Sequence, residues 1–139
     1  MNVLVDTSVW SLAFRRKSQD LSSAQTALVG ELAELIKEGR IRLIGPVRQE
    51  LLSGIPSSEQ FEELCAILQP FLDEPLAAPD YEDAAKASNQ CRRKGVTVSV
   101  VDALICSVAI SRDWAIFTTD PDFENYSRIL PLKLHKPRR

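Results

Sequence analysis

Short apolar runs alternate along the chain with longer segments in which apolar side chains recur at helical spacing. Short, mostly apolar runs predict strands buried on both faces of a sheet, and they lie at residues 2–5, 41–44, 115–118 and 129–134. Apolar positions three and four residues apart predict helices, which we expect at residues 7–14, 22–37, 45–54, 59–72, 80–94 and 100–112. Residues 74–79 are predicted to form a brief edge strand.

This alternation predicts an α/β sandwich, in which helices cover both faces of a parallel sheet. No internal repeat, linker or shift in composition divides the 139 residues. A chain of this length is the usual size of one domain. We therefore expect residues 1–139 to form a single α/β domain.

Composition excludes several classes of protein. Hydrophobic residues make up 45% of the chain and charged residues 26%, which is typical of a soluble globular protein. The three cysteines show no metal-binding spacing, so we expect reduced thiols. Asp6 interrupts the first apolar run, where a secretory signal needs unbroken apolar residues, and Asp102 interrupts the longest one. A cytoplasmic location is the expectation.

The charge of the chain is nearly balanced, with 17 Lys and Arg against 19 Asp and Glu. A net charge of −2 argues mildly against a simple nucleic-acid binder, which usually carries a basic excess. Basic residues do gather at 15–17, at 92–94 and in the C-terminal tail. These clusters could guide an RNA backbone, and each could equally be a solvated face.

Acidic residues follow two of the predicted strands at the point where each strand ends. Asp6 lies just past the first strand, and Asp120 and Asp122 lie just past the strand at 115–118. Sites in open parallel sheets form beyond the carboxyl ends of the strands. If these two strands are neighbours, the three acids converge at one edge of the sheet.

Two further acids lie on predicted helices. Asp102 belongs to the first turn of the apolar helix at 100–112, and Glu50 flanks the apolar stripe of the helix at 45–54. Gathering ionised carboxylates in apolar surroundings costs several kcal/mol per ion, unless they share protons or bind a cation. Oxygen ligands without nearby His or Cys suit Mg²⁺ or Mn²⁺. Such ions activate water and clamp phosphate oxygens, which is the chemistry of phosphodiester hydrolysis.

Each acid also has a structural interpretation. Asp6 is a good N-cap for the helix that follows it, and Ser99 with Asp102 fits a capping box. Glu50 would ordinarily be a solvated helix charge, and Asp120-Pro-Asp122 is a turn and helix-start signal. The acids favour a catalytic site as a set and not one by one.

Four motifs carry a resemblance to a known family. They are Val-Leu-Val-Asp-Thr-Ser-Val-Trp at 3–10, Val-Arg-Gln-Glu-Leu-Leu-Ser-Gly at 47–54, Ser-Val-Val-Asp-Ala-Leu-Ile at 99–105 and Phe-Thr-Thr-Asp-Pro-Asp-Phe at 117–123. In this order and spacing the chain resembles PIN-domain nucleases, and among them the VapC-type toxin ribonucleases. The resemblance covers the chain from end to end.

The resemblance implies a three-layer α/β/α sandwich, Rossmann-like, around a parallel sheet. It also implies an endoribonuclease that depends on Mg²⁺ or Mn²⁺, cuts tRNA, rRNA or mRNA, and is the toxin of a toxin–antitoxin pair. The expected partners are a second copy of the chain, as a homodimer, and a small VapB-like antitoxin that blocks the acidic pocket.

The family's acidic quartet corresponds by position to Asp6, Glu50, Asp102 and Asp120. Asp6 and Asp102 would hold the ion, Asp120 would complete or orient its shell, and Glu50 would position or deprotonate the attacking water. Four further residues are auxiliary candidates. They are a further acid, Asp122, and three hydroxyl residues, Thr118 before Asp120 and Thr7 and Ser8 after Asp6.

Two other functions compete with this interpretation. One is a DNA-directed nuclease or phosphohydrolase that uses the same acids, since nothing in the motifs visibly reads the 2′-hydroxyl. The other is a receiver-like signalling or binding module with an acidic Mg²⁺ pocket and no nuclease activity, but Lys133 is poorly placed for the lysine that such a module needs. Among the remaining residues, His135 is expected to be solvated, and Trp10, Trp114 and Cys106 to pack in the core.

Overall fold

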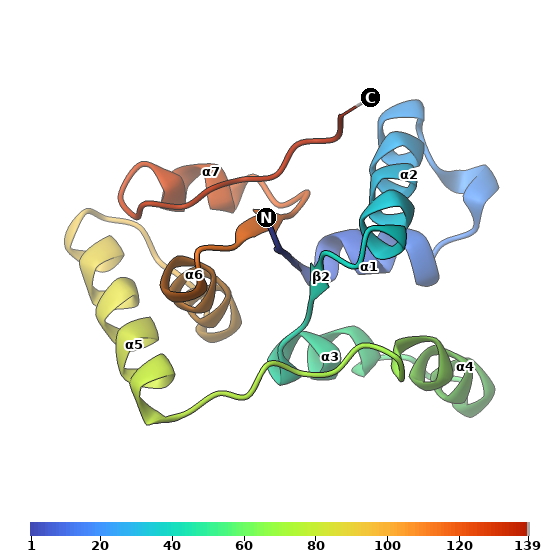
Figure 1. Cartoon of the computed structure of the whole chain (residues 1–139), viewed down its shortest axis with the longest axis horizontal. Helices are drawn as coiled ribbons and strands as arrows, with labels where there is room; N and C mark the ends of the chain where they lie inside the picture. Colours follow the sequence, from blue (N-terminus) through green and yellow to red (C-terminus); the bar gives the residue numbers. More distant parts are fainter. Residues whose placement is uncertain (139) are drawn as a thin grey trace.

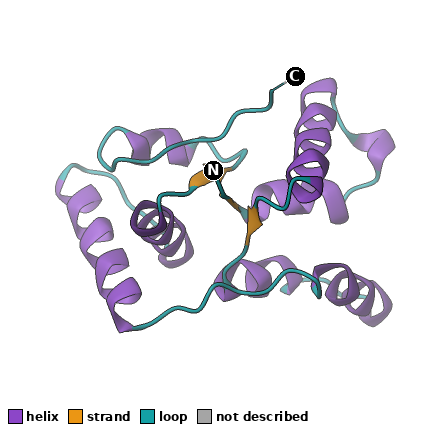
Figure 2. Ribbon diagram, viewed as in Figure 1, coloured by secondary structure: helices purple, strands orange, loops and turns teal. Residues whose placement is uncertain are grey.

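Three short parallel strands form the sheet at the centre of the molecule (Figures 1 and 2). The computed structural model describes residues 1–138. Strand β1 (Val3–Val5) lies between β2 (Ile41–Arg42) and β3 (Ala115–Phe117), and Val3 pairs with Ile41 on one side and Ala115 on the other. The carboxyl ends of β1 and β3 therefore meet at the same edge of the sheet.

Helices surround this sheet in two outer layers. Figure 1 shows α1 and α2 on one side of it and the packed pair α5 and α6 on the other, which agrees with the α/β sandwich expected from the sequence. Described by their bounds, the helices are α1 (Thr7–Phe14), α2 (Ser23–Lys37), α3 (Gly45–Leu52), α4 (Ser58–Leu68), α5 (Ala78–Arg93), α6 (Val100–Arg112), α7 (Asp122–Ser127) and a 3₁₀ turn (Ser18–Asp20).

Local sequence explains where several helices begin and end. The Ser22 side chain accepts a hydrogen bond from the Gln25 backbone, and the Gln25 side chain accepts one from Ser22, a capping box that starts α2. Glycines with positive φ follow α2 and α5, at Gly39 (+68°) and Gly95 (+83°). A side chain at either position would meet the steric penalty of the left-handed region.

The core forms between the sheet and α6. Every residue of β1 and β3 is buried, and α6 is buried over the whole stretch from Ala103 to Ala109. Trp10 is fully buried, Trp114 nearly so, and Cys106 fully, as expected from the sequence. Helix α6 is thus enclosed over this stretch, and its first turn carries one acid, Asp102.

Two predicted strands are wrong in this structure. Residues 74–79 contain no strand; the neighbouring Asp73 makes a single bridge to Leu43, and α5 already begins at Ala78. Asp80 accepts a hydrogen bond from the Ala77 backbone, so it caps α5 from inside its first turn. The strand expected at 129–134 is reduced, within residues 1–138, to one bridge between Leu134 and Ile116.

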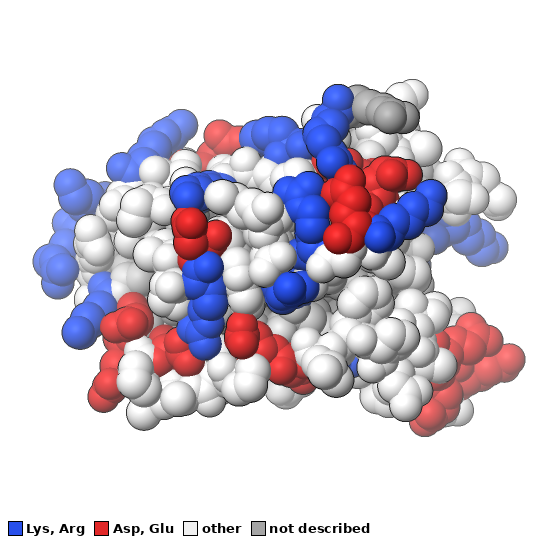
Figure 3. All heavy atoms as spheres, viewed as in Figure 1, with Lys and Arg blue, Asp and Glu red and all other residues white. Residues whose placement is uncertain are grey.

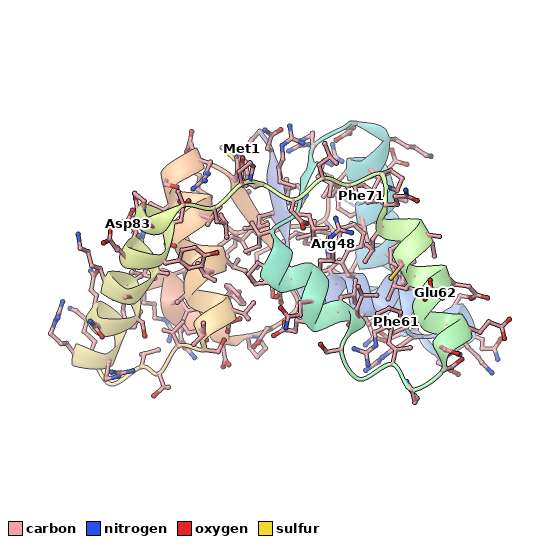
Figure 4. All side chains as sticks on the ribbon, turned by 90° about the horizontal axis from the view of Figure 1, so that it is seen from below. Met1, Arg48, Phe61, Glu62, Phe71 and Asp83 are labelled. Atoms are coloured by element: carbon pink, nitrogen blue, oxygen red, sulfur yellow. The ribbon has the colours of Figure 1, made fainter. Side chains whose placement is uncertain are left out.

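Arg48 ties α3 to the segment that follows α4, as Figure 4 shows. Its guanidinium donates to the carboxylate of Asp73 at 3.0 Å, to the carbonyl of Leu68 at 3.2 Å and to the carbonyl of Phe71. The carbonyls at the end of a helix lack intrahelical partners, so this arginine satisfies groups that would otherwise need water. The tie fixes α3, the helix that carries Glu50.

The C-terminal tail crosses from β3 to α2, where Figure 3 shows acidic and basic side chains interleaved. The His135 backbone donates to Ile116 at 2.7 Å. The His135 ring packs edge-on against Phe117 and lies 2.6 Å from a Glu31 carboxylate oxygen. The expectation of a solvated His135 is therefore wrong, because the tail docks against the sheet. Within residues 1–138, no helix is both long enough and apolar enough to cross a membrane.

Candidate active site at the carboxyl edge of the sheet

Asp6 lies at the centre of the carboxyl edge. Its backbone N–H donates to Phe117 at 2.9 Å, which continues the pairing of β1 with β3 beyond the strands, and its side chain is only 5% exposed. The expected adjacency of these two strands is thus confirmed. It brings the segment after β3, with Thr118 and Asp120, next to Asp6.

Two hydroxyl groups point their protons at one oxygen of Asp6. Ser8 and Thr118 both donate to Asp6 Oδ2, at 2.7 and 2.8 Å. Both hydroxyl oxygens in turn accept backbone N–H bonds, from Thr119 to Ser8 and from Asp120 to Thr118, each at 3.0 Å. Each hydroxyl therefore has both of its functions in use: its oxygen accepts a backbone N–H, and its one proton is donated to the Asp6 carboxylate. Oδ2 of Asp6 is held, and the geometry leaves Oδ1 as its free oxygen.

Asp102 lies in the first turn of α6. Its backbone N–H donates to the Ser99 hydroxyl at 3.1 Å, so the helix cap expected from the sequence is present. Its carboxylate has a separate contact, since Oδ2 accepts a hydrogen bond from the Tyr126 hydroxyl at 2.9 Å. Asp102 therefore fits both interpretations. Its backbone N–H is capped by the Ser99 hydroxyl, and its carboxylate belongs to the candidate site.

The carboxylates of Asp6, Asp102 and Asp120 act on one another electrostatically. The pKa of Asp102 is raised to about 6, mainly by burial. The hydrogen bond from Tyr126 lowers this pKa, whereas the negative charges of Asp6 and Asp120 raise it further. Within the described part of the chain, residues 1–138, the charges that act on Asp102 are all negative, so this edge of the sheet is an anionic site. Such pKa shifts are typical of functional sites.

Two predicted site residues stand apart from this group. Glu50 is exposed in the last turn of α3 and is not among the carboxylates that act on Asp102. Asp122 is exposed at the first position of α7, where its backbone N–H donates to Asp120 Oδ1 at 2.9 Å. Asp122 thus has the helix-start role that its motif also predicts. Thr7 Oγ1 is buried and without a hydrogen-bond partner among residues 1–138.

The donor set of the site fits a hard divalent cation. It consists of carboxylate oxygens, and an ion there would offset the burial and the neighbouring negative charges that together raise the pKa of Asp102. No three acidic, His or Cys side chains among residues 1–138 are close enough together to hold an ion. Asp6 and Asp102 are the buried and half-buried donors that would hold it, and Asp120, whose charge acts on Asp102, would complete its shell without lying within reach of the same ion in this structure.

Tyr126 is a site residue that the sequence analysis missed. It lies on α7, 2% exposed, with its ring against Phe123. The signal was present in the sequence, because two aromatic residues three positions apart after Asp122 indicate a buried helix face. A buried tyrosine hydroxyl usually finds a polar partner, but its identity, Asp102, depends on the packing of α7 against α6.

Comparison with known proteins identifies a family. The model of the PIN domain family matches residues 3–129. The chain belongs to the PIN domain family. The matched range contains Asp6, Glu50, Asp102 and Asp120, the four acids that the sequence motifs predict for the site.

Solved structures of similar fold match this PIN domain over nearly its whole length. The FitAcB structure from Neisseria gonorrhoeae has a TM-score of 0.73 at 20% identity, with 97% of each chain covered. The Rickettsia felis VapBC2 structure, bound to a promoter DNA fragment, has a TM-score of 0.75 at 22% identity, with 97% of this chain and 98% of that one covered. The DNA-bound VapBC structure from Salmonella typhimurium has a TM-score of 0.60 at 19% identity and covers 97% of both chains. At these identities the likeness establishes the fold.

Proposed function

We propose that this PIN domain is a Mg²⁺- or Mn²⁺-dependent endoribonuclease that acts as the toxin of a toxin–antitoxin pair. One observation carries the proposal: the negative charges of Asp6 and Asp120 act on Asp102 at the carboxyl edge of the sheet, and no positive charge from residues 1–138 offsets them there. PIN domains are generally nucleases. An anionic pocket repels RNA phosphates by itself, so the proposal requires a cation between the carboxylates and the substrate.

The residues of the site divide the work according to their contacts. Asp6, held through Oδ2 by Ser8 and Thr118, and Asp102, held through Oδ2 by Tyr126, would bind the ion together with Asp120. A divalent ion bound there supplies charge neutralisation of the phosphate and a lowered pKa for water.

Glu50 would accept the proton of the attacking water. Its position on α3 is fixed by the neighbouring Arg48, which anchors the helix to the segment after α4. General-base catalysis of this kind contributes about 10²- to 10⁴-fold to a rate. We therefore expect Glu50→Gln to lose cleavage by roughly that factor while retaining metal binding.

An antitoxin partner is the second part of the proposal. Three of the structurally similar proteins are solved as FitAB or VapBC assemblies, and this chain matches their chains in length as well as in fold. A small VapB-like protein would cover the acidic site and inhibit it. We further propose a homodimer in a cytoplasmic setting; light scattering of the purified chain tests the dimer.

Cleavage of matched substrates tests the nuclease. The purified chain is incubated with a structured RNA and with DNA of the same sequence, in Mg²⁺, in Mn²⁺ and in EDTA, beside the variant Asp102→Asn. The expected result is endonucleolytic cuts in the RNA alone, dependent on metal and absent in the variant. Cleavage of the DNA would favour a DNA-directed nuclease, and cutting that survives Asp102→Asn would show that other residues are responsible.

Coexpression tests the partner. The chain is expressed in bacteria with and without the product of the neighbouring gene. We expect growth arrest without that product, growth with it, and copurification of the two proteins. Growth arrest in the Asp102→Asn variant would contradict a toxicity that depends on this site.

A further inference from the structure

We infer that Tyr126 is a positioning residue for the metal-binding carboxylate of Asp102. Its hydroxyl donates to Asp102 Oδ2 at 2.9 Å, so one oxygen of the carboxylate is held, while the other accepts no hydrogen bond from residues 1–138 and is available to a cation. The same arrangement holds Asp6, whose Oδ2 receives the hydroxyls of Ser8 and Thr118. This inference rests on the proposed metal dependence of the site.

The tyrosine is itself fixed in place. Its side chain is 2% exposed, and its ring meets the fully buried Phe123 edge to face, with 5.1 Å between centroids. A phenol ordinarily keeps its proton at neutral pH, so the hydroxyl is a donor to the Asp102 carboxylate. Tyr126 is therefore a permanent donor whose ring has little freedom to move.

Helix α7 makes this contact a link between two parts of the site. The helix begins at Asp122, whose backbone N–H donates to Asp120 Oδ1 at 2.9 Å, and it ends just beyond Tyr126. One end of α7 thus contacts Asp120, and the other contacts Asp102 on α6. The hydroxyl of Tyr126 connects the two carboxylates, which come from segments far apart in the sequence, through one short helix.

Outer contacts that orient metal ligands typically change metal affinity or activity by about 10- to 100-fold when removed. The variant Tyr126→Phe removes only the hydroxyl and keeps the buried ring. We expect its dissociation constant for Mn²⁺, measured by calorimetry on the purified chain without RNA, to rise by about 10-fold or more. The Mn²⁺ concentration that half-activates RNA cleavage should rise by the same factor, with the rate recovering at high Mn²⁺.

Two matched variants separate positioning from packing. Tyr81→Phe removes the hydroxyl of an exposed tyrosine on α5 and should leave Mn²⁺ affinity unchanged. Phe123→Leu loosens the aromatic packing of α7 and should lower the melting temperature while Mn²⁺ affinity stays within about twofold, far less than the loss of an orienting contact. If Phe123→Leu weakens Mn²⁺ binding as much as Tyr126→Phe does, the hydroxyl has no specific role and the inference is overturned.

A spectroscopic measurement covers the case in which Tyr126→Phe does not fold. The chain has two tyrosines, so the Tyr81→Phe variant leaves Tyr126 as the single one. Titration of that variant with Mn²⁺ should give a tyrosine ultraviolet difference spectrum that saturates with the calorimetric affinity for Mn²⁺ and is lost on adding Asp102→Asn. A spectrum unchanged by Mn²⁺ would overturn the inference.

The failure of this inference is distinguishable from that of the proposed function. If the wild-type chain binds Mn²⁺ and cleaves RNA, and Tyr126→Phe binds Mn²⁺ equally well, only the role of Tyr126 is wrong. If the wild-type chain binds no Mn²⁺ in calorimetry, the proposed metal dependence fails and the role of Tyr126 fails with it.

Discussion

Two buried carboxylates in this protein are stabilised in opposite ways. Asp6, in the candidate active site, is 5% exposed, and Glu31, under the C-terminal tail, is 6% exposed. Glu31 receives Arg138 through Nε and Nη2 at 3.0–3.2 Å and lies 2.6 Å from His135 Nε2. The hydroxyls on Asp6 are neutral donors. Burial is thus compensated by positive charge in one region and by neutral hydrogen bonds in the other.

The pKa values of the two regions move in opposite directions. Burial by itself raises the pKa of Glu31, but the hydrogen bonds and charges of Arg138 and His135 outweigh it, so the pKa lies below its ordinary value of 4.5. Burial raises the pKa of Asp102 from 3.8 to about 6, and the neighbouring carboxylates add to the effect. The tail cluster is complete without a ligand, whereas the site carboxylates remain unfavourable until a cation joins them.

This difference shows how the same kind of residue serves structure in one place and function in another. A carboxylate paired with arginine stabilises the fold and binds nothing further. Carboxylates left together are a stability cost that proteins accept at functional sites. The three predictions that follow test whether the two regions differ in this way, from the largest expected effect to the smallest.

The largest effect is expected for Asp102→Asn. Cleavage should fall by about 10²-fold or more, since the ion loses a ligand. The metal-free protein should become more stable at pH 7, on the order of 1–2 kcal/mol after allowance for solvent screening. Urea denaturation in EDTA, from pH 4 to pH 8, measures the stability.

The pH dependence of that gain follows from the sign of the shift. Between pH 3.8 and about 6 the folded wild-type chain binds more protons at Asp102 than the unfolded chain does, so its stability falls as pH rises. The advantage of Asp102→Asn should therefore be full above about pH 6 and absent near pH 4. An equal advantage at both ends of the range would show that Asp102 is not strained.

Divalent metal should remove the same strain. Mn²⁺ at 100 times its dissociation constant should stabilise the wild-type chain by about 2.7 kcal/mol and the Asp102→Asn variant by much less, as measured by the shift in urea midpoint. Glu31→Gln, which leaves the site intact, serves as the matched control and should gain as much from Mn²⁺ as the wild type. A gain of equal size in Asp102→Asn would contradict the assignment of the ligand.

The smallest effect is expected for Glu31→Gln, which should destabilise the chain at neutral pH by about 1.5 kcal/mol, because hydrogen bonds to a charged group are lost. Since the folded pKa of Glu31 is lowered, its contribution is present above pH 4.5 and is lost as pH falls through the folded pKa. The difference between variant and wild type should therefore shrink in acid. A difference that grows in acid would contradict the compensated character of this cluster.

Local sequence was sufficient to determine most elements and the order of the site motifs. The buried runs at β1 and β3, the apolar helix α6 and the caps at Ser22 and Ser99 all follow from side chains close together in the chain. It was insufficient where a weak strand pattern lies next to a helix start. The strand expected at 74–79 is absent because the adjacent first turn of α5, with Pro79 and Asp80, starts a helix there.

What the sequence by itself determined is the set of acids and their places at the ends of strands and helices, because strand periodicity and capping are local. Tertiary structure decided which carboxylates share a site and which one has the raised pKa. It also decided that Tyr126 contacts Asp102 and that Arg138 pairs with Glu31 in the tail cluster. Those outcomes depend on burial and on distances between side chains that are 24 to 112 positions apart, such as Tyr126 to Asp102 and Thr118 to Asp6. No local pattern encodes such distances, since they arise only when the helices pack on the sheet.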